Sequence, residues 1–220
     1  MKSLRKVMVG IDEAGRGSLV GDLFVVAVAV ASDRRVELAE AGVRDSKLLS
    51  RSRRYELLLK VIECSEAIIV NRITPEEIDR ENINDLEVRA VERSVRHLKS
   101  RGLNPVRIVI DEIAGREKQV EAVCRKYFPD VEVVMEPGAD RDFIEVSAAS
   151  IVAKTMRDLH IRSLSNIYGE IGSGYPSDPR TISWLNKVRS AGHIPRCVRM
   201  SWKTVRRGVS RTLDEFVKKR

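Results

Sequence analysis

Val7-Met8-Val9-Gly10-Ile11-Asp12-Glu13 and, a hundred residues later, Val106-Arg107-Ile108-Val109-Ile110-Asp111-Glu112 share one pattern. In each stretch, a short apolar run of the length of a buried strand ends in two carboxylates. Buried strands rarely carry acids unless the acids are paired or bind a cation. Ligand sites of open α/β sheets lie at the carboxyl ends of the strands. Two parallel neighbouring strands would therefore bring Asp12 and Asp111 together, where they suit a hard divalent cation such as Mg²⁺.

Length and charge place the chain in a broad class. Its 220 residues are enough for one compact domain with a sizeable core and a small extension. Hydrophobic residues make up 43% and charged residues 33%, which is typical of a soluble globular chain and excludes a disordered one. The formal net charge is +8. A basic chain with an acidic cluster is typical of a protein that does metal chemistry on a polyanion, although a charge-rich solvated surface explains the charge equally well.

The sequence also bears on location. The longest apolar run, residues 23–31, has the length of a strand and not of a membrane span. The N-terminus lacks the pattern of a signal peptide. Cys64, Cys124 and Cys197 are far apart and show neither zinc nor redox spacing. We therefore expect a cytoplasmic protein with reduced thiols and no membrane contact, and we expect it to act as a monomer.

Hydrophobic periodicity predicts an alternation of strands and helices. Strands are expected over 6–12, 24–31, 67–73, 106–111 and 131–135, and helices over 51–64, from Thr74-Pro75, over 84–100 and 117–127, from 147, and over 180–191 and 204–219. The helix over 51–64 would turn Tyr55, Leu58, Leu59 and Ile62 to one apolar face. This order favours a mixed sheet with helices on both faces. A Gly-, Pro- and Ser-rich loop suggests a catalytic domain over 1–170 and a helical C-terminal extension over 171–220.

Several segments carry residue types that suit nucleic acid. The glycines of Gly15-Arg16-Gly17 let the backbone approach a ligand closely, and the arginine fork suits phosphate. Lys47, in Asp45-Ser46-Lys47, could hold phosphate oxygens, and Tyr175, in a glycine-rich loop, could stack on a base or sugar. The basic run 196–211 around Trp202 suits nucleic-acid contact or a solvated helix face. Taken singly, each is as readily explained by an ordinary turn, cap or core anchor.

A fourth acid stands close to the predicted strand ends. Asp140 lies in a loop after the strand expected over 131–135, where it could reach Asp12 and Asp111. On the following helix, Ser150, Lys154 and Asp158 are four residues apart and share a face. Alanines at 148, 149 and 153 leave the rest of that helix small enough to pack closely on a sheet.

Together these motifs resemble ribonuclease HII, the type 2 ribonuclease H family, in its archaeal form. The segments that carry the resemblance are 10–17, 45–48, 110–111, 139–140, 147–154 with 157–158, 172–179 and 199–204. They span most of the chain in the family's order. Ser18 and Asp22 depart from the family pattern, which usually has proline at both positions.

The resemblance implies an α/β fold of the ribonuclease H type, with a mixed five-stranded central sheet flanked by helices. It also implies an endonuclease that cleaves the RNA strand of RNA/DNA hybrids, and DNA duplexes at embedded ribonucleotides, as in ribonucleotide excision repair. Two divalent cations, Mg²⁺ or Mn²⁺, would support hydrolysis to 5′-phosphate and 3′-hydroxyl ends.

The same resemblance implies roles for individual residues. The catalytic metal ligands would be Asp12, Glu13, Asp111 and Asp140. The loop of Gly15, Arg16 and Gly17 would sense the 2′-hydroxyl, the group that distinguishes RNA from DNA. Tyr175 would stack on the sugar at the RNA–DNA junction, and Lys47 would lie near the substrate phosphates.

Two other functions fit parts of the pattern. A nucleic-acid-binding module with structural acids would bind hybrid with a steep salt dependence and would cut nothing. A metal-dependent DNA nuclease or integrase on the same fold would cut all-DNA duplexes. The set of four acids argues against the module, and the Gly15-Arg16-Gly17 loop directly after two of the acids argues against the DNA nuclease.

Overall fold

The computed structural model describes residues 6–43 and 50–206. By compactness the chain divides into two units that interleave along the sequence. The described part of the first unit is 6–14, 24–43, 50–72 and 83–156, and that of the second is 15–23, 73–82 and 157–206. The division at residue 170 that the sequence suggests stays a prediction. No helix in the described ranges has the length and apolar character needed to cross a membrane.

The first unit is built on a five-stranded sheet with the strand order β3-β2-β1-β4-β5. The strands are β1 (Val7–Ala14), β2 (Leu23–Ala31), β3 (Ser65–Ile73), β4 (Pro105–Asp111) and β5 (Glu132–Glu136). β1 pairs antiparallel with β2 and parallel with β4, and β4 pairs parallel with β5. The prediction of a mixed five-stranded sheet flanked by helices is confirmed.

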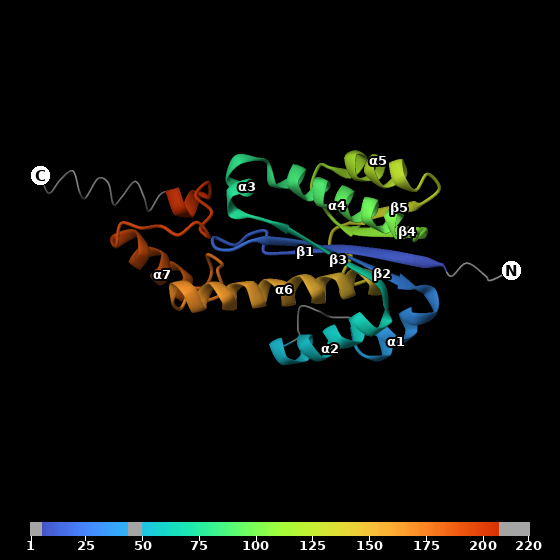
Figure 1. Cartoon of the computed structure of the whole chain (residues 1–220), viewed down its shortest axis with the longest axis horizontal. Helices are drawn as coiled ribbons and strands as arrows, with labels where there is room; N and C mark the ends of the chain where they lie inside the picture. Colours follow the sequence, from blue (N-terminus) through green and yellow to red (C-terminus); the bar gives the residue numbers. More distant parts are fainter. Residues whose placement is uncertain (1–5, 44–49, 207–220) are drawn as a thin grey trace, which may run out of the picture. The chain divides into compact units, whose positions relative to one another are not determined.

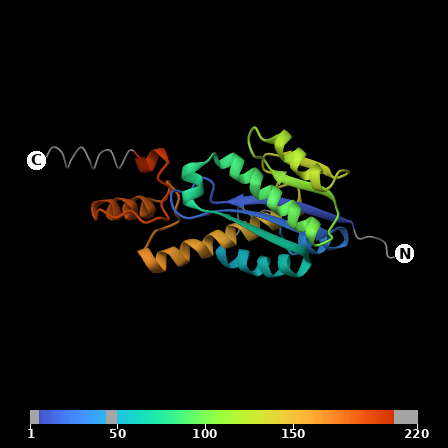
Figure 2. The same cartoon turned by 45° about the horizontal axis from the view of Figure 1, so that its top comes forward.

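Helices cover both faces of this sheet. α4 (Ile83–Ser100) and α5 (Glu117–Tyr127) lie on one face, and α6 (Ile144–Tyr168) lies on the other (Figures 1 and 2). A 3-10 turn (Ser32–Arg34), α1 (Arg35–Glu40) and α2 (Arg51–Cys64) lie on the side of α6. Because both faces are covered, β2 is a continuous apolar run that is buried along its whole length.

Small residues bring α6 onto the sheet. A Cβ atom at Gly10 of β1 would lie 2.1 Å from the carbonyl carbon of Glu145, so only glycine fits there. Ala148, Ala149 and Ala153 are buried in the core cluster between α6 and the sheet. The predicted close packing through small residues is therefore present in the structure, and α6 begins at Ile144, three residues before the expected start.

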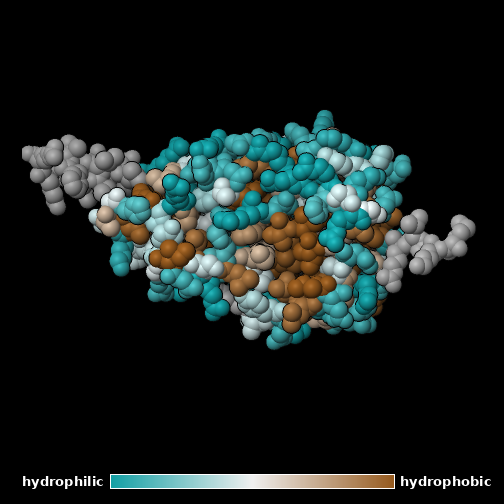
Figure 3. Space-filling view, in the orientation of Figure 1, coloured by the Kyte–Doolittle hydropathy of each residue, from teal (hydrophilic) through white to brown (hydrophobic). Residues whose placement is uncertain are grey.

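The predicted apolar face of α2 is wrong except at Leu58, which packs partly buried against the core. Leu57, Val61 and Cys64 face the core, whereas Leu59 is 70% exposed and Ile62 53% exposed. Apolar residues occur all around this helix, so spacing alone does not identify the buried side. Figure 3 shows apolar side chains gathered on the molecular face where β3 and α2 lie. The short segment 32–40, which carries no clear apolar periodicity, is helical although no helix is predicted there.

The second unit contains α3 (Pro75–Arg80) and α7 (Pro179–Ser190). The helix start predicted at Thr74-Pro75 is confirmed, and Thr74 and Glu77 form a reciprocal capping box there. Asp178 caps α7 by accepting a hydrogen bond from the backbone N–H of Arg180. The core of this unit is formed by Leu19, Val20, Ile171, Trp184, Leu185, Cys197, Val198 and Val205. The helix expected over 204–219 lies almost wholly outside the described residues.

Candidate active site

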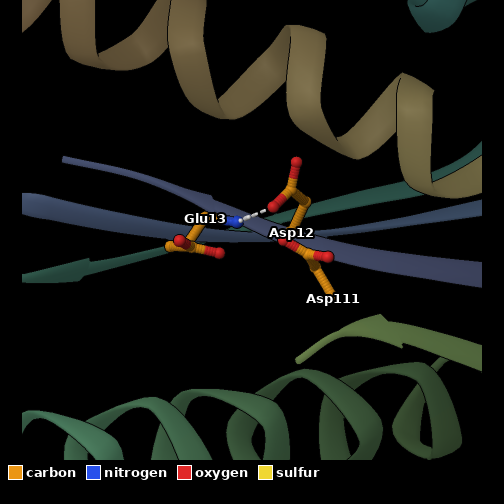
Figure 4. A group of neighbouring side chains, drawn as sticks. All are labelled: Asp12, Glu13 and Asp111. Carbon is orange, nitrogen blue, oxygen red and sulfur yellow. Dashed lines mark hydrogen bonds between the residues drawn. The ribbon is translucent and has the colours of Figure 1, made fainter. Parts of the chain in front are cut away.

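Three carboxylates meet at the carboxyl ends of β1 and β4. The parallel register pairs Ile11 with Ile110, so that the next residues, Asp12 and Asp111, lie side by side. One carboxylate oxygen from each of Asp12, Glu13 and Asp111 lies within 4.8 Å of the others (Figure 4). The backbone N–H of Glu13 donates to Oδ1 of Asp12 at 2.7 Å. The meeting of Asp12 and Asp111 that the sequence predicts is confirmed.

Asp12 is the most enclosed of the three acids, with 7% of its surface exposed. Burial raises the pKa of its carboxyl well above the usual value, and the negative charges of Glu13 and Asp111 add to that rise. A hydrogen bond from the side chain of Ser150 on α6 opposes it. Asp12 therefore sits where a negative charge is costly unless a positive charge is brought to it.

This donor set fits a hard divalent cation. Mg²⁺ binds carboxylate oxygens at about 2.0–2.1 Å, so that two of its ligands are at most about 4.2 Å apart. The oxygens of Asp12, Glu13 and Asp111 lie within 4.8 Å of one another, and small side-chain rotations would bring them to that separation. A bound cation would also offset the mutual repulsion of the three carboxylates.

Asp111 is held by the loop that contains the fourth predicted acid. Its Oδ1 accepts hydrogen bonds from the backbone N–H groups of Gly138, at 2.7 Å, and Ala139, at 3.1 Å. Asp140, the next residue, is buried, and its carbonyl accepts a hydrogen bond from the hydroxyl of Ser147. Asp140 does not belong to the three-carboxylate cluster, so its role as a metal ligand stays a prediction.

The sequence reasoning missed a further acid beside the cluster. Glu87 on α4 is 2% exposed and lines the same small pocket as Asp12, Glu13 and Asp111. The sequence holds a signal for its burial, because Glu87 shares the helical spacing of Ala90, Val91 and Ser94 on the buried face of α4. An acid on the apolar side of an amphipathic helix is rare and therefore indicates a functional residue.

In the second unit, the Gly15-Arg16-Gly17 loop is a tight turn. Gly15 has a φ of 101°, a left-handed conformation that favours glycine. The N–H and the hydroxyl of Ser18 both donate to the carbonyl of Gly15, at 3.3 and 2.9 Å. Ser18 thus closes the turn by hydrogen bonds from both its backbone and its side chain.

The loop of Tyr175 is joined to this turn by the backbone. The N–H of Leu19 donates to the carbonyl of Gly174 at 2.7 Å. A Cβ atom at Gly17 would lie 4.0 Å from Cε1 of Tyr175, so the turn adjoins the ring. The guanidinium of Arg157 lies over the same ring, 4.2 Å from its centroid, and donates to the carbonyl of Ser173. The second unit therefore brings the Gly15-Arg16-Gly17 loop and Tyr175 together.

The predicted residues are thus distributed over two units. The four acids lie in the first, and the loop and Tyr175 lie in the second. Lys47, with Asp45 and Ser46, lies outside the described residues. Arg199, which belongs to the basic run around Trp202, is fully buried and is not part of a solvated helix face.

Comparison with known families agrees with this geometry. A family model described as Ribonuclease HII matches residues 9–205. The chain belongs to the ribonuclease HII family. It is therefore a type 2 ribonuclease H, a metal-dependent phosphodiester endonuclease, as the resemblance implied.

Individual members of the family are similar over nearly their whole length. Ribonuclease HII of Aeropyrum pernix is 43% identical over 222 residues, which cover 96% of this chain and 98% of the relative. The crystal structure of ribonuclease H2 from Pyrococcus horikoshii OT3 is 37% identical and gives a TM-score of 0.82, covering 93% of this chain and 98% of the other. The PCNA:RNase HII complex of Archaeoglobus fulgidus contains a chain that is 34% identical, with a TM-score of 0.77 and coverages of 90% and 95%.

Proposed function

We propose that this enzyme hydrolyses the RNA strand of RNA/DNA hybrids and also cuts DNA duplexes at single embedded ribonucleotides, using two divalent cations. The observation that carries the proposal is the cluster of Asp12, Glu13 and Asp111 at two adjacent parallel strand ends. Phosphodiester hydrolysis by paired cations needs several carboxylates in one place, and no histidine base or serine nucleophile.

The acids would hold the cations, and the cations would in turn bind the phosphate. Asp12, Glu13, Asp111 and Asp140 would form the ligand set. Bound cations would supply an activated water and would stabilise the leaving 3′-oxygen, so that hydrolysis would give 5′-phosphate and 3′-hydroxyl ends. The chain fixes the geometry: Ser150 holds the carboxyl of Asp12, and the amides of Gly138 and Ala139 hold that of Asp111.

The second unit would select the cleavage position. The Gly15-Arg16-Gly17 turn exposes backbone at Gly17, next to the ring of Tyr175. We assign the turn to the 2′-hydroxyl, Tyr175 to the sugar at the RNA–DNA junction, and Lys47 to the substrate phosphates. Only Ala14 separates Glu13 from Gly15 in the sequence. All these residues come from one chain, so a monomer would suffice.

The proposal is tested by cleavage of a labelled DNA duplex that contains one ribonucleotide, beside an all-DNA duplex of the same sequence and an RNA/DNA hybrid. Each is incubated with Mg²⁺, with Mn²⁺ and with a chelator. We expect metal-dependent cutting of the hybrid and of the first duplex, with a single cut at the ribonucleotide. The end groups of the products are read by phosphatase and ligase treatment.

The other outcomes identify the alternatives. Cutting of the all-DNA duplex would indicate a DNA nuclease. Binding that weakens steeply with salt, with no cutting of any duplex, would indicate a binding module. Cutting of the hybrid alone would keep the ribonuclease and remove the embedded ribonucleotide from its substrates.

A further inference from the structure

Arg199 in the second unit is a buried arginine with an unusual set of partners. None of its surface is exposed. Its Nη1 donates to the carbonyl of Arg16 at 2.8 Å, and its Nε donates to the carbonyl of Gly21 at 3.0 Å. Burial lowers the pKa of the guanidinium to about 10, which still leaves it protonated near neutral pH. A full positive charge is thus placed inside the protein against the backbone of the Gly15-Arg16-Gly17 turn.

The segment that carries Arg199 is itself firmly placed. The N–H of Arg199 donates to the carbonyl of Leu19 at 2.9 Å, and the carbonyl of Cys197 accepts from the N–H of Gly21 at 2.8 Å. After Arg199, the carboxylate of Asp79 on α3 accepts from the N–H groups of Met200 and Ser201, both at 2.8 Å. The backbone on both sides of Arg199 is therefore held by hydrogen bonds, which fixes where its guanidinium contacts Arg16.

Planarity of the peptide bond transmits this contact to Gly17. The carbonyl of Arg16 and the N–H of Gly17 belong to one peptide group, whose atoms lie in a plane with the two bonds pointing in opposite directions. Holding the Arg16 carbonyl on the inner side of the turn therefore fixes the direction of the Gly17 N–H. Gly17 is exposed, and within the described ranges its N–H has no acceptor.

We propose that Arg199 is a positioning residue for ribose recognition: by holding the carbonyl of Arg16 from inside the protein, it aims the N–H of Gly17 at the 2′-oxygen of the substrate. This inference rests on the proposed function, because it assumes that the turn senses the 2′-hydroxyl. Arg199 itself touches no substrate. A lysine could not replace it, because a single ammonium lacks the planar fork that reaches two carbonyls at once.

The test measures discrimination between two ligands and not activity. Binding is measured by fluorescence anisotropy with two labelled DNA duplexes, one containing a single ribonucleotide and one all DNA, in Mg²⁺. The parent protein carries Asp111→Asn so that neither duplex is cut. The readout is the ratio of the two dissociation constants. A merely structural residue would change stability, or both affinities together, and would leave this ratio unchanged.

A matched control exists in the same unit. Arg189 also donates to two backbone carbonyls, those of Thr204 and Val205, and neither belongs to the turn. We expect Arg199→Lys to reduce the ratio by about tenfold, the value of one well-placed hydrogen bond. Arg189→Lys should leave the ratio as in the parent. An Arg199→Lys protein that keeps the parent ratio would overturn the inference.

The remaining outcomes are distinguishable. If Arg199→Lys does not fold, Asp79→Ala decides, because it removes both acceptors that hold the N–H groups of Met200 and Ser201, and Asp79 is only half-buried. A reduced ratio supports the inference, and an unchanged ratio overturns it. If the parent itself shows no preference for the ribonucleotide, the proposed function fails and the inference falls with it. A parent that discriminates, beside an Arg199→Lys protein that discriminates equally, overturns the inference alone.

Discussion

Gly10 on β1 and Glu145 on α6 approach so closely that a Cβ atom at position 10 would lie 2.1 Å from the carbonyl carbon of Glu145. This contact fixes the helix along the strand. The same Cβ atom would lie 2.3 Å from the backbone N of Val146. Asp12 stands two residues further along β1, about 6.6 Å away, and Ser150 stands four residues beyond Val146 on α6, about 6 Å away. The two advances match, so the hydrogen bond from Ser150 to Asp12 follows from the contact at Gly10.

Gly10→Ala should therefore damage both stability and activity. Backbone atoms cannot move aside as a flexible side chain can, so we expect a loss of about 3 kcal/mol or more in the free energy of unfolding. Cleavage should also fall, because α6 must shift away from Asp12. The measurement is urea unfolding together with hybrid cleavage. Gly102→Ala is the control, since Gly102 has a φ of 74° and open space around it. Equal losses for the two variants would contradict this account.

The sequence predicts more of the sheet than of its surroundings. The apolar runs that end in Asp12 and Asp111 identify two buried strands, but that these strands are parallel neighbours was only a condition of the sequence argument, and the structure supplies it. The same pattern includes Glu112, yet Glu112 is exposed and outside the cluster. Which of two successive acids turns into a site depends on tertiary packing and not on the local sequence.

Burial that depends on segments distant in the sequence is harder to predict. Glu87 and Arg199 are charged residues in stretches that read as a surface helix and a basic run, and both are buried because distant segments fold over them. The sequence does not identify the apolar face of α2 for a related reason: the helix has apolar residues on several sides, and only the position of the core decides between them. Capping signals were more reliable, because Thr74 and Glu77 interact within a single turn.

Glu145 offers a test of a buried charge. Its side chain is fully buried and pairs with Arg35, at 3.1 Å, and with Arg107, at 3.3 Å. We expect the double substitution Arg35→Met with Arg107→Met to cost about 3–5 kcal/mol, because it leaves a buried carboxylate without a partner. Each single substitution should cost much less, since one arginine remains. Urea unfolding of the four proteins measures the coupling, and strict additivity of the single effects would refute the shared role of Glu145.

Asp178 should make stability depend on pH in the acid range. Hydrogen bonds from Arg180, and then from the N–H of Ser173, hold its pKa below the usual value. Since the folded-state pKa is lower than the unfolded one, the carboxylate stabilises the fold above the unfolded pKa, and this contribution is lost as pH falls through the folded-state pKa. Asp178→Asn should therefore lower the Tm at pH 7, with a smaller difference at pH 3. Asp130→Asn, an exposed site, serves as the control, and a pH-independent difference would argue against the ion pair.

A substitution at Tyr175 distinguishes stacking of its ring on the substrate from packing of the ring within the protein. Its ring lies under the guanidinium of Arg157 and next to Gly17. We expect Tyr175→Ala to weaken binding to a duplex with one ribonucleotide by about tenfold, within the range of a lost aromatic stack, with a smaller effect on all-DNA duplex. Tyr127→Ala, on the ring beside Lys126 in the first unit, is the matched control. An unchanged preference would make Tyr175 an anchor of its loop.

The most direct test of the central claim is the activity of Asp111→Asn on a DNA duplex that contains one ribonucleotide. Asparagine keeps the shape of Asp111, and its side-chain oxygen can still accept from Gly138 and Ala139, but it removes the charge that a cation needs. We predict that cleavage falls by more than about 100-fold. Loss of a residue that only supports a metal ligand already lowers activity by up to about 100-fold, and Asp111 would itself be a ligand. Binding should stay close to that of the unchanged protein. Near-native cleavage by the folded variant would show that the carboxylates of Asp12, Glu13 and Asp111 are not the catalytic centre.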